Sequence, residues 1–328
     1  MSTVTTQTPE TVQAPTANRL RQILSSDRPY TVFLALVALI IFFSLRSDVF
    51  FSTANFANIG RQTTLVTIMA VGMTFVIISA EIDLSVASTL KLSGVCAALF
   101  MSNFGDNWVL GAIVGLLVGA TVGLINGLLV TRLGIPSFLV TLGMLGIAKG
   151  LAFVVTDTAP VLVDNQQFFT VFYEGGVLGI PVPIIWSIVV LIAGGTLLHY
   201  TTFGRKVYAT GGNAMAARYS GINTARVKVL GFVLTGMTAA LAALIFAAQA
   251  HASRPDFADG LELDVIAAVI LGGTSLFGGR GTIIGTLIGS LIIGVLNNGL
   301  VIIGVSSSWQ IAVKGGIIIL AVAFSKKH

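Results

Sequence analysis

Ten apolar runs, separated by short polar intervals, make up most of the chain. Each run is long enough to cross, or nearly cross, the hydrocarbon core of a bilayer, which is about 30 Å thick. The third and eighth runs are short or interrupted by glycine, so we expect them to span the membrane only in part or to re-enter it. The runs cover residues 30–45, 62–80, 86–101, 108–130, 136–155, 182–200, 229–250, 265–278, 282–303 and 309–324. This pattern predicts an all-α integral membrane protein with about ten transmembrane or partly spanning helices.

Composition gives the same fold class. The chain has 328 residues, of which 55% are hydrophobic and 9% charged, whereas soluble domains carry about 25% charged residues. We expect one transmembrane domain at residues 30–325, preceded by a disordered cytoplasmic tail at residues 1–29 because that stretch is polar. The one cysteine, Cys96, cannot form an intramolecular disulfide, and the three histidines are too scattered for a metal site. The basic excess follows from the loops and predicts no nucleic-acid partner.

Basic residues between the runs predict the orientation. If the N-terminus lies inside, the inner segments hold twelve of the eighteen Lys and Arg residues, the outer segments hold three, and three lie within runs. Since cytoplasmic loops carry the excess of Lys and Arg, both termini are expected in the cytoplasm. The two long outer loops, residues 156–181 and 251–264, are acidic. Each is either a contact for an extracytoplasmic partner or a solvated lid.

The polar stretch 201–228, which we call the coupling stretch, is the most distinctive interval. It carries five positive charges and no acid. Its middle predicts a short helix, because Asn213 can accept from the first-turn N–H groups and Gly221 can adopt the left-handed conformation that ends a helix. Three alanines between them offer a small-residue surface to another protein: Ala214, Ala216 and Ala217. Three glycines would orient this helix as a unit: Gly204, Gly211 and Gly212. The stretch is therefore either a docking element or an ordinary cytoplasmic loop.

Glycines recur every fourth residue along the fourth run, at 111–127, and again at 281–289, where the ninth run begins. This spacing places them on one helix face and favours close helix packing over lining of a pore. Asn126-Gly127-Leu128 in the fourth run is matched by Asn298-Gly299-Leu300 in the ninth. Because these two runs cross in opposite directions, we expect an inverted repeat that relates segments 2–5 to segments 7–10.

Polar residues at and within the runs are candidates for a gate or pathway. Glu81, Asp83 and Ser85 lie at the break between the second and third runs, where carboxylates usually face water or protein. Asp83 and Ser85 could equally cap the helix that begins at Val86. Six polar residues lie inside runs: Lys91, Asn126, Lys149, Asn297, Asn298 and Lys314. The lysines could reach the interface with their long stems, and Asn126 and Asn298 could bond between helices. The pathway candidates are Glu81, Asp83, Ser85, Lys91, Asn126 and Asn298.

No catalytic motif is visible. The glycine-rich stretch 272–281 resembles a phosphate loop superficially, but no Gly-Lys-Ser/Thr sequence occurs in the chain. A zinc-protease His-Glu-x-x-His and a Gly-x-Ser-x-Gly nucleophile turn are also missing. We therefore expect no enzymatic activity, no ATP hydrolysis by this chain, and no cofactor of its own.

Several stretches together resemble a known family. They are Asn55-Phe56-Ala57-Asn58-Ile59, Glu81-Ile82-Asp83-Leu84-Ser85, Tyr208-Ala209-Thr210-Gly211-Gly212-Asn213 with Ala216-Ala217 and Ser220-Gly221-Ile222, Ile270-Leu271-Gly272-Gly273-Thr274-Ser275 with Gly278-Gly279, and Asn298-Gly299-Leu300. The chain resembles the permease subunits of bacterial ATP-binding-cassette importers for monosaccharides, of the ribose, xylose and rhamnose type in the branched-chain amino acid/ribose permease superfamily. The likeness covers residues 30–324. Family members often carry glycine where this chain has Glu81 and Ala87.

The resemblance implies the partners. Residues 211–222 look like the coupling helix that seats in a groove of a cytoplasmic ATP-binding subunit, which would bind the ATP. The coupling candidates are Gly211, Gly212, Asn213, Ala216, Ala217, Ser220 and Gly221. A second permease copy or paralogue would complete the path, and a periplasmic sugar-binding protein would deliver the solute. The chain would be a multi-pass protein of the bacterial inner membrane, surrounded by lipid.

Other interpretations stay open from the sequence. The solute could be another small molecule, such as a branched-chain amino acid or autoinducer-2. An ion-coupled secondary transporter is a second class, although no convincing buried carboxylate relay is visible. A membrane enzyme or a scaffold is a third. The identity of the sugar, and whether two permeases form a homodimer or a heterodimer, cannot be read from the chain.

Overall fold

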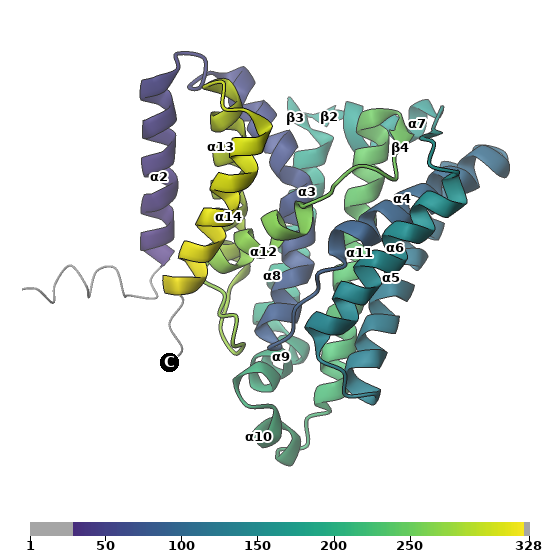
Figure 1. The fold of residues 1–328 in the computed structure, drawn as a ribbon, viewed down its shortest axis with the longest axis vertical. Helices are drawn as coiled ribbons and strands as arrows, with labels where there is room; N and C mark the ends of the chain where they lie inside the picture. The colour runs from purple at the N-terminus through teal and green to yellow at the C-terminus, as the bar shows by residue number, and fades with distance from the viewer. Residues whose placement is uncertain (1–28, 325–328) are drawn as a thin grey trace, which may run out of the picture.

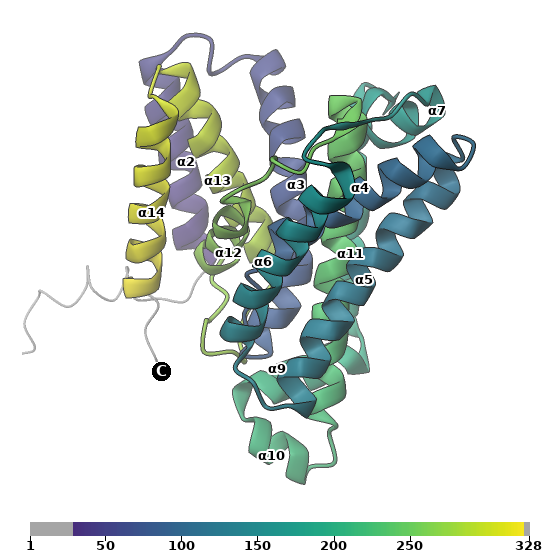
Figure 2. The same cartoon turned by 45° about the vertical axis from the view of Figure 1, so that its right-hand side comes forward.

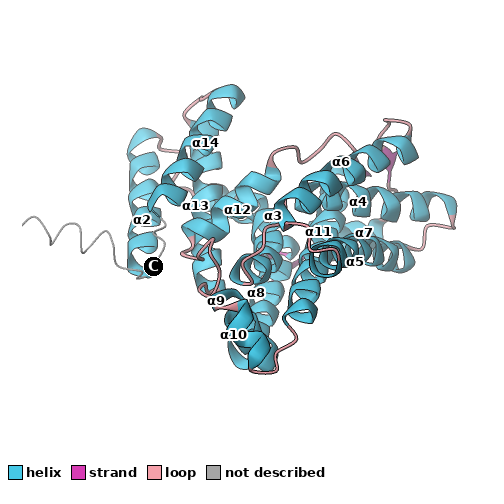
Figure 3. Ribbon diagram, turned by 60° about the horizontal axis from the view of Figure 1, so that its bottom comes forward, coloured by secondary structure: helices cyan, strands magenta, loops and turns pink. Residues whose placement is uncertain are grey.

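The computed structural model describes residues 29–324 and is almost entirely helical (Figures 1 and 3). Its helices in chain order are α2 (Pro29–Arg46), α3 (Thr53–Ile78), α4 (Val86–Asn103), α5 (Trp108–Arg132), α6 (Ser137–Thr156), α7 (Gln166–Phe169), η1 (Thr170–Glu174), α8 (Val182–Tyr200), α9 (Thr202–Gly212), α10 (Ala214–Tyr219), α11 (Thr224–Ala250), α12 (Leu261–Leu271), α13 (Ile283–Ile302) and α14 (Ser307–Phe324). Four two-residue strands complete it: β1 (Val161–Leu162), β2 (Gly176–Val177), β3 (Ile180–Pro181) and β4 (Ala252–Ser253). The all-α prediction is confirmed.

Each of the ten predicted runs corresponds to one helix: α2, α3, α4, α5, α6, α8, α11, α12, α13 and α14. Within the described residues, six helices are long and apolar enough to cross a membrane: α3, α5, α6, α8, α11 and α13. The eighth run is partial as expected, because α12 has eleven residues and is therefore about 16 Å long. The second helix begins at Thr53 and not at residue 62, since Ser52 caps a polar first turn. The predicted disordered tail, apart from Pro29, lies outside the described residues.

Two sets of helices pack in matching ways, as the inverted repeat predicts. Helix α11 packs on α4 and α5, and α3 packs on α12 and α13. Likewise α4 contacts α6, and α12 contacts α14. In Figures 1 and 2, α3 runs towards the end of the molecule that carries α9 and α10, while α11 runs away from that end. The helices α3, α4, α5 and α6 therefore correspond to α11, α12, α13 and α14, respectively. Corresponding helices have corresponding neighbours within the two sets, and the chain runs through them in opposite directions.

Glycine permits close helix crossings, one of them between α5 and α11. A Cβ on Gly119 would lie 2.8 Å from Ala240 Cβ and closer to the carbonyl oxygen of Gly236, so nothing larger than glycine fits there. Gly123 meets the backbone of Phe232 in the same way. In the ninth run, Gly289 approaches the backbone of Ala268 on α12. The glycine spacing therefore serves helix packing, as predicted, and does not line a pore.

The two outer loops form one structure at the end opposite α10 (Figure 1). Strand β1 pairs antiparallel with β4, with Val161 opposite Ser253. The His251 ring stacks on Phe169 with ring centroids 4.0 Å apart, and its Nε2 lies 3.1 Å from Glu174 Oε1. One loop prediction is wrong, because α12 begins at Leu261 and takes Glu262 and Asp264 into a helix, where Asp264 is buried.

Candidate functional site

The coupling stretch forms two helices and projects from one end of the molecule (Figure 2). As predicted, Asn213 caps the second helix, α10, since its Oδ1 accepts from the backbone N–H of Met215 at 3.1 Å and of Ala216 at 3.0 Å. Gly221 adopts the predicted left-handed conformation, with φ +83°. The residues before Asn213 form the helix α9, whose amphipathic pattern the sequence analysis missed. Thr201 starts it by accepting from the N–H of Gly204 at 3.2 Å.

The exposed face of α10 differs in part from the expected one, since Ala214 and Ala216 are exposed as predicted. Ala217 is buried against the protein, so the prediction that it offers a surface to a partner is wrong. Met215 and Tyr219, four residues apart on one face, project outward instead, and Tyr219 is 87% exposed. Five other candidates are exposed as a partner contact requires: Gly212, Asn213, Ala216, Ser220 and Gly221. The four-residue spacing of Met215 and Tyr219 was the sequence signal for this face.

The candidate Gly211 faces inward and belongs to a joint. We use this name for the place where Gly211 of α9, Ile78 at the end of α3, and the loop 272–282 meet. The N–H of Gly279 donates to the carbonyl oxygen of Ile78 at 2.9 Å, and Gly211 packs against both residues without room for a side chain. The Tyr208 hydroxyl donates to the carbonyl oxygen of Gly281 at 2.6 Å. The joint thus ties the coupling stretch to both halves of the repeat.

Two details explain why the joint can form. Gly278 and Gly279 have φ of +83° and +74°. Residues with a Cβ atom rarely adopt this backbone conformation, so glycine allows the stretch to make a tight turn here. Burial raises the pKa of the Tyr208 phenol. The phenol therefore stays neutral and remains a hydrogen-bond donor at physiological pH.

The pathway candidate Glu81 contacts the last residue of the coupling stretch. Lys228 Nζ donates to Glu81 Oε1 at 2.5 Å, which joins the start of α11 to the break that follows α3. Both side chains are largely covered. Screening is therefore weaker than for a surface pair. This ion pair is a second physical link between the coupling stretch and the transmembrane helices.

Three pathway candidates come together at the start of α4. The buried Asp83 carboxylate accepts from the Ser85 backbone N–H at 2.8 Å and from the Ser85 hydroxyl at 2.6 Å. The Asn126 side chain on α5 donates to the Ser85 hydroxyl oxygen at 2.9 Å. Asp83 therefore holds the turn that precedes α4, which is close to the capping role that the sequence left open, whereas the Ser85 side chain makes no capping bond. Asn126 bonds between helices, as predicted.

The remaining candidates lie elsewhere. Lys91 pairs with Asp259, a residue of the segment before α12, and Asn298 is buried on α13. That the lysines within runs reach towards the interface stays a prediction; in the described chain each of them pairs with a carboxylate. Lys149 also pairs with Asp259, and Lys314 pairs with the buried Asp264 at 2.8 Å. The candidates thus divide into separate polar clusters and do not converge on one site.

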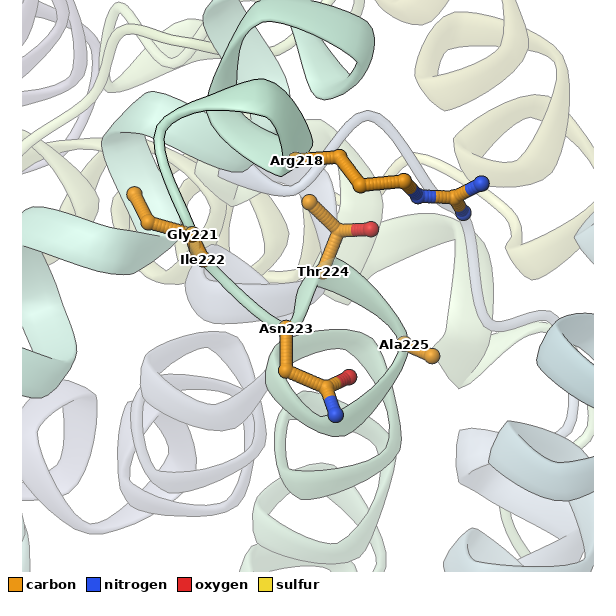
Figure 4. A pocket seen from close by; sticks show the side chains of 6 residues that line it. All are labelled: Arg218, Gly221, Ile222, Asn223, Thr224 and Ala225. Atoms are coloured by element: carbon orange, nitrogen blue, oxygen red, sulfur yellow. The ribbon is translucent and has the colours of Figure 1, made fainter.

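An open hollow lies beside α10, where the chain turns into α11 (Figure 4). It is lined by Arg218, Gly221, Ile222, Asn223, Thr224 and Ala225. Figure 4 shows the Arg218 side chain extended away from the turn, with the Thr224 hydroxyl on the same side. Arg218 belongs to α10, so the hollow borders this helix, whereas Met215 and Tyr219 are not among its lining residues. Among the described residues, no group of three His, Cys, Asp or Glu side chains could hold a metal ion.

Comparison with known proteins relates the whole fold to one family. Residues 55–322 match the family described as the permease component of the branched-chain amino acid transport system. The ribose import permease protein of Bacillus subtilis (strain 168) is 46% identical over 296 residues, which cover 90% of this chain and 92% of that protein. The D-allose transport system permease protein of Escherichia coli (strain K12) is 39% identical, with 92% of each chain covered. The L-arabinose transporter permease protein of Azospirillum brasilense is 37% identical, covering 98% of this chain and 94% of that protein. No solved structure matches the chain.

Proposed function

The chain belongs to the family of permease components of the branched-chain amino acid transport system, and we propose that it is the permease subunit of an ATP-binding-cassette importer for a monosaccharide. Relatives that align over nine-tenths of the chain or more are named as permeases for ribose, allose and arabinose. The chain itself is a transport component and not an enzyme. Its solute class comes from these relatives, since no residue of the chain by itself distinguishes one sugar from another.

The observation that carries the proposal is the exposed, capped helix α10 at the end of the coupling stretch. Its outward residues Met215 and Tyr219 are large and apolar in part, and they have no covering element within the described chain. Exposed apolar side chains beside a hollow favour a protein contact. We infer that a separate ATP-binding subunit covers this face. ATP would then be bound and hydrolysed by that partner.

Motion of the partner would reach the transmembrane helices through contacts of the coupling stretch. Helix α9 contacts α3 and the loop 272–282 at the joint, and Lys228 contacts Glu81. A rigid displacement of α9 and α10 would therefore move elements of both repeat halves together. This is the coupling that alternating access between inward-open and outward-open states requires.

The same proposal assigns the two ends of the molecule. The end with α9 and α10 would face the cytoplasm, together with both ends of the described chain, in the inner membrane of a bacterium. The opposite end, where β1 pairs with β4, would face the periplasm and receive a sugar-binding protein. Exposed apolar faces of α5, α6 and α8 would contact lipid or a second permease copy or paralogue.

Reconstituted transport tests the proposed function. The protein is placed in proteoliposomes with its ATP-binding subunit and solute-binding protein, and uptake of labelled ribose, allose and arabinose is followed with and without ATP. ATP-dependent uptake of at least one monosaccharide is expected. Uptake that persists without the ATP-binding subunit would contradict the proposal and indicate a secondary transporter.

The family description favours one competing solute class, the branched-chain amino acids. The same proteoliposomes distinguish the two. Excess unlabelled leucine, isoleucine or valine should leave monosaccharide uptake unchanged. ATP-driven uptake of leucine with no monosaccharide uptake would assign the chain to the amino acid group.

A further inference from the structure

A cluster of three charged side chains joins two helices and a loop segment. It consists of Lys91 on α4, Lys149 on α6 and Asp259 on the segment between β4 and α12; we call it the charged cluster. The two ammonium groups donate to different oxygens of the Asp259 carboxylate, Lys149 to Oδ2 at 2.9 Å and Lys91 to Oδ1. Three elements that are distant in the sequence therefore meet at one carboxylate. The coupling mechanism proposed above does not use this cluster.

The charged cluster lies well below the outer end of the helices. Lys149 comes seven residues before the end of α6 at Thr156, which corresponds to about 10 Å along the axis. Side chains on a helix lean towards its N-terminus. The Lys149 side chain therefore leans deeper still, away from the outer end. In Figure 1, the segment after β4 descends from the outer end towards the start of α12; Asp259 belongs to this segment and accepts from Lys149.

Exposure of the three side chains is strongly unequal. The Lys91 side chain is 1% exposed, whereas those of Lys149 and Asp259 are 37% and 58% exposed. A charged group at this depth that faced lipid would be costly, so such groups face a water-filled cavity or protein. On the other flank of α6, Ile147 is exposed and apolar, as a lipid-facing side chain would be. Leu142, seven residues before Lys149 on the same flank, is also exposed and apolar, so it is the charge of Lys149 that assigns this position to water.

The charged cluster has unused hydrogen-bonding capacity on its exposed side. A carboxylate can accept about four hydrogen bonds and an ammonium group can donate three. Within residues 29–324, the Asp259 carboxylate accepts one bond on each oxygen, and Lys149 donates one. An acceptor and a donor thus stand side by side. Adjacent hydroxyl groups of a sugar, each able to donate and accept, match this arrangement.

We propose that the charged cluster lines the translocation path and binds hydroxyl groups of the solute as it passes. The buried Lys91 fixes the carboxylate, while Asp259 and Lys149 present the acceptor and donor. The ligand class, a neutral monosaccharide, rests on the proposed function. The water-facing position of the cluster rests only on the depth, charge and exposure of these side chains.

Thiol accessibility tests the position of the charged cluster. In a Cys96→Ala background, a single cysteine is introduced as Lys149→Cys, or as Ile147→Cys on the opposite flank at nearly the same depth. Proteoliposomes containing the complete importer are treated with a charged, membrane-impermeant methanethiosulfonate. Because the thiolate reacts and an apolar surrounding suppresses ionisation, Lys149→Cys should react at least about tenfold faster than Ile147→Cys. Equal rates would overturn the water-facing assignment.

Protection by solute tests the ligand class. Gly146→Cys lies one turn before Lys149, leaves all three charges in place, and meets no neighbour at its Cβ. Addition of monosaccharide-loaded binding protein should slow labelling of Gly146→Cys and of Lys149→Cys but not that of Ile147→Cys. If Gly146→Cys and Lys149→Cys are labelled fast and the solute protects neither, the proposal that the charged cluster binds solute hydroxyl groups is overturned.

Failure of this inference can be separated from failure of the proposed function. A wild-type importer that carries no monosaccharide refutes the proposed function, whereas the labelling rates measure the position of the charged cluster without any transport. Variants are compared only if they elute from size exclusion as the wild type does. Gly146→Cys keeps the position test valid if loss of Lys149 prevents folding.

Discussion

Replacing Gly211 by alanine is expected to open the joint between α9 and the rest of the molecule. The new Cβ would lie 2.7 Å from the backbone nitrogen of Gly279 and closer still to the carbonyl oxygen of Ile78. These neighbours are backbone atoms that cannot rotate away. Helix α9 must therefore move as a unit. Gly212, the next residue, has no atom within 4 Å of its Cβ position, so Gly212→Ala is a matched control.

The magnitude follows from these contacts. Ordinary contact begins at 3.4 Å, so relief of the Gly279 contact alone requires a separation of at least about 0.7 Å, and the Ile78 contact requires more. Inserting a methyl group into a packed site costs about 1–3 kcal/mol. Since about 1.4 kcal/mol changes an equilibrium tenfold, the closed joint should become less populated by about tenfold. Because we propose that the joint transmits the motion of α10, coupling should fall with it.

The assay is uptake of solute per ATP hydrolysed in proteoliposomes containing all subunits. Gly211→Ala should bind the ATP-binding subunit normally but transport less solute for each ATP, while Gly212→Ala should match the wild type in both. Equal transport stoichiometry in the two variants would refute the assigned role of the joint. Loss of ATPase binding by Gly211→Ala would also refute it, because the contact surface of α10 would then depend on the joint.

Three further predictions follow from buried contacts. Glu81→Lys should impair coupled uptake, because it places two positive charges together. The double variant Glu81→Lys with Lys228→Glu should recover part of the uptake. Equal defects in the single and double variants would mean that this ion pair does not link the coupling stretch to the transmembrane helices. Lys314→Met leaves the buried Asp264 carboxylate without its ion partner and should lower the free energy of unfolding by about 3–5 kcal/mol, seen as a lower midpoint in a thermal size-exclusion assay. An unchanged midpoint would show that Asp264 is solvated or neutral. Gly123→Leu should force α5 and α11 apart and reduce the yield of monodisperse protein, and a normal yield would contradict the close crossing.

The membrane fold could be predicted from the sequence because bilayer crossing imposes strong local rules. Apolar length identified each spanning helix, and the glycine interruption identified the short helix α12. Helix starts were less predictable, since polar first turns such as that after Ser52 belong to the helix but not to the apolar run. Asp264 was likewise assigned to the outer loop because it is polar, although it belongs to the first turn of α12. Its burial depends on Lys314, which is distant in the sequence and pairs with the carboxylate.

The coupling stretch was only partly predictable. Asn213 and Gly221 act within a few residues, so their capping roles could be read from neighbouring positions. Gly211 and Ala217 were expected to face a partner, but their surroundings are set by tertiary packing. Asp259 was missed as a site residue because its contacts lie on α4 and α6, and no local spacing indicates them.

Co-purification tests the central claim most directly. The wild-type protein and Gly212→Glu are purified from gently solubilised native membranes, and the bound proteins are identified. Gly212 is exposed and its Cβ position is free of neighbours, so the variant should fold while placing a charge beside α10. The account predicts that an ATP-binding subunit accompanies the wild type and is lost with Gly212→Glu. Recovery of the same subunit with both proteins would contradict docking at α10, and absence of any ATP-binding subunit from abundant, folded wild type would contradict the importer assignment.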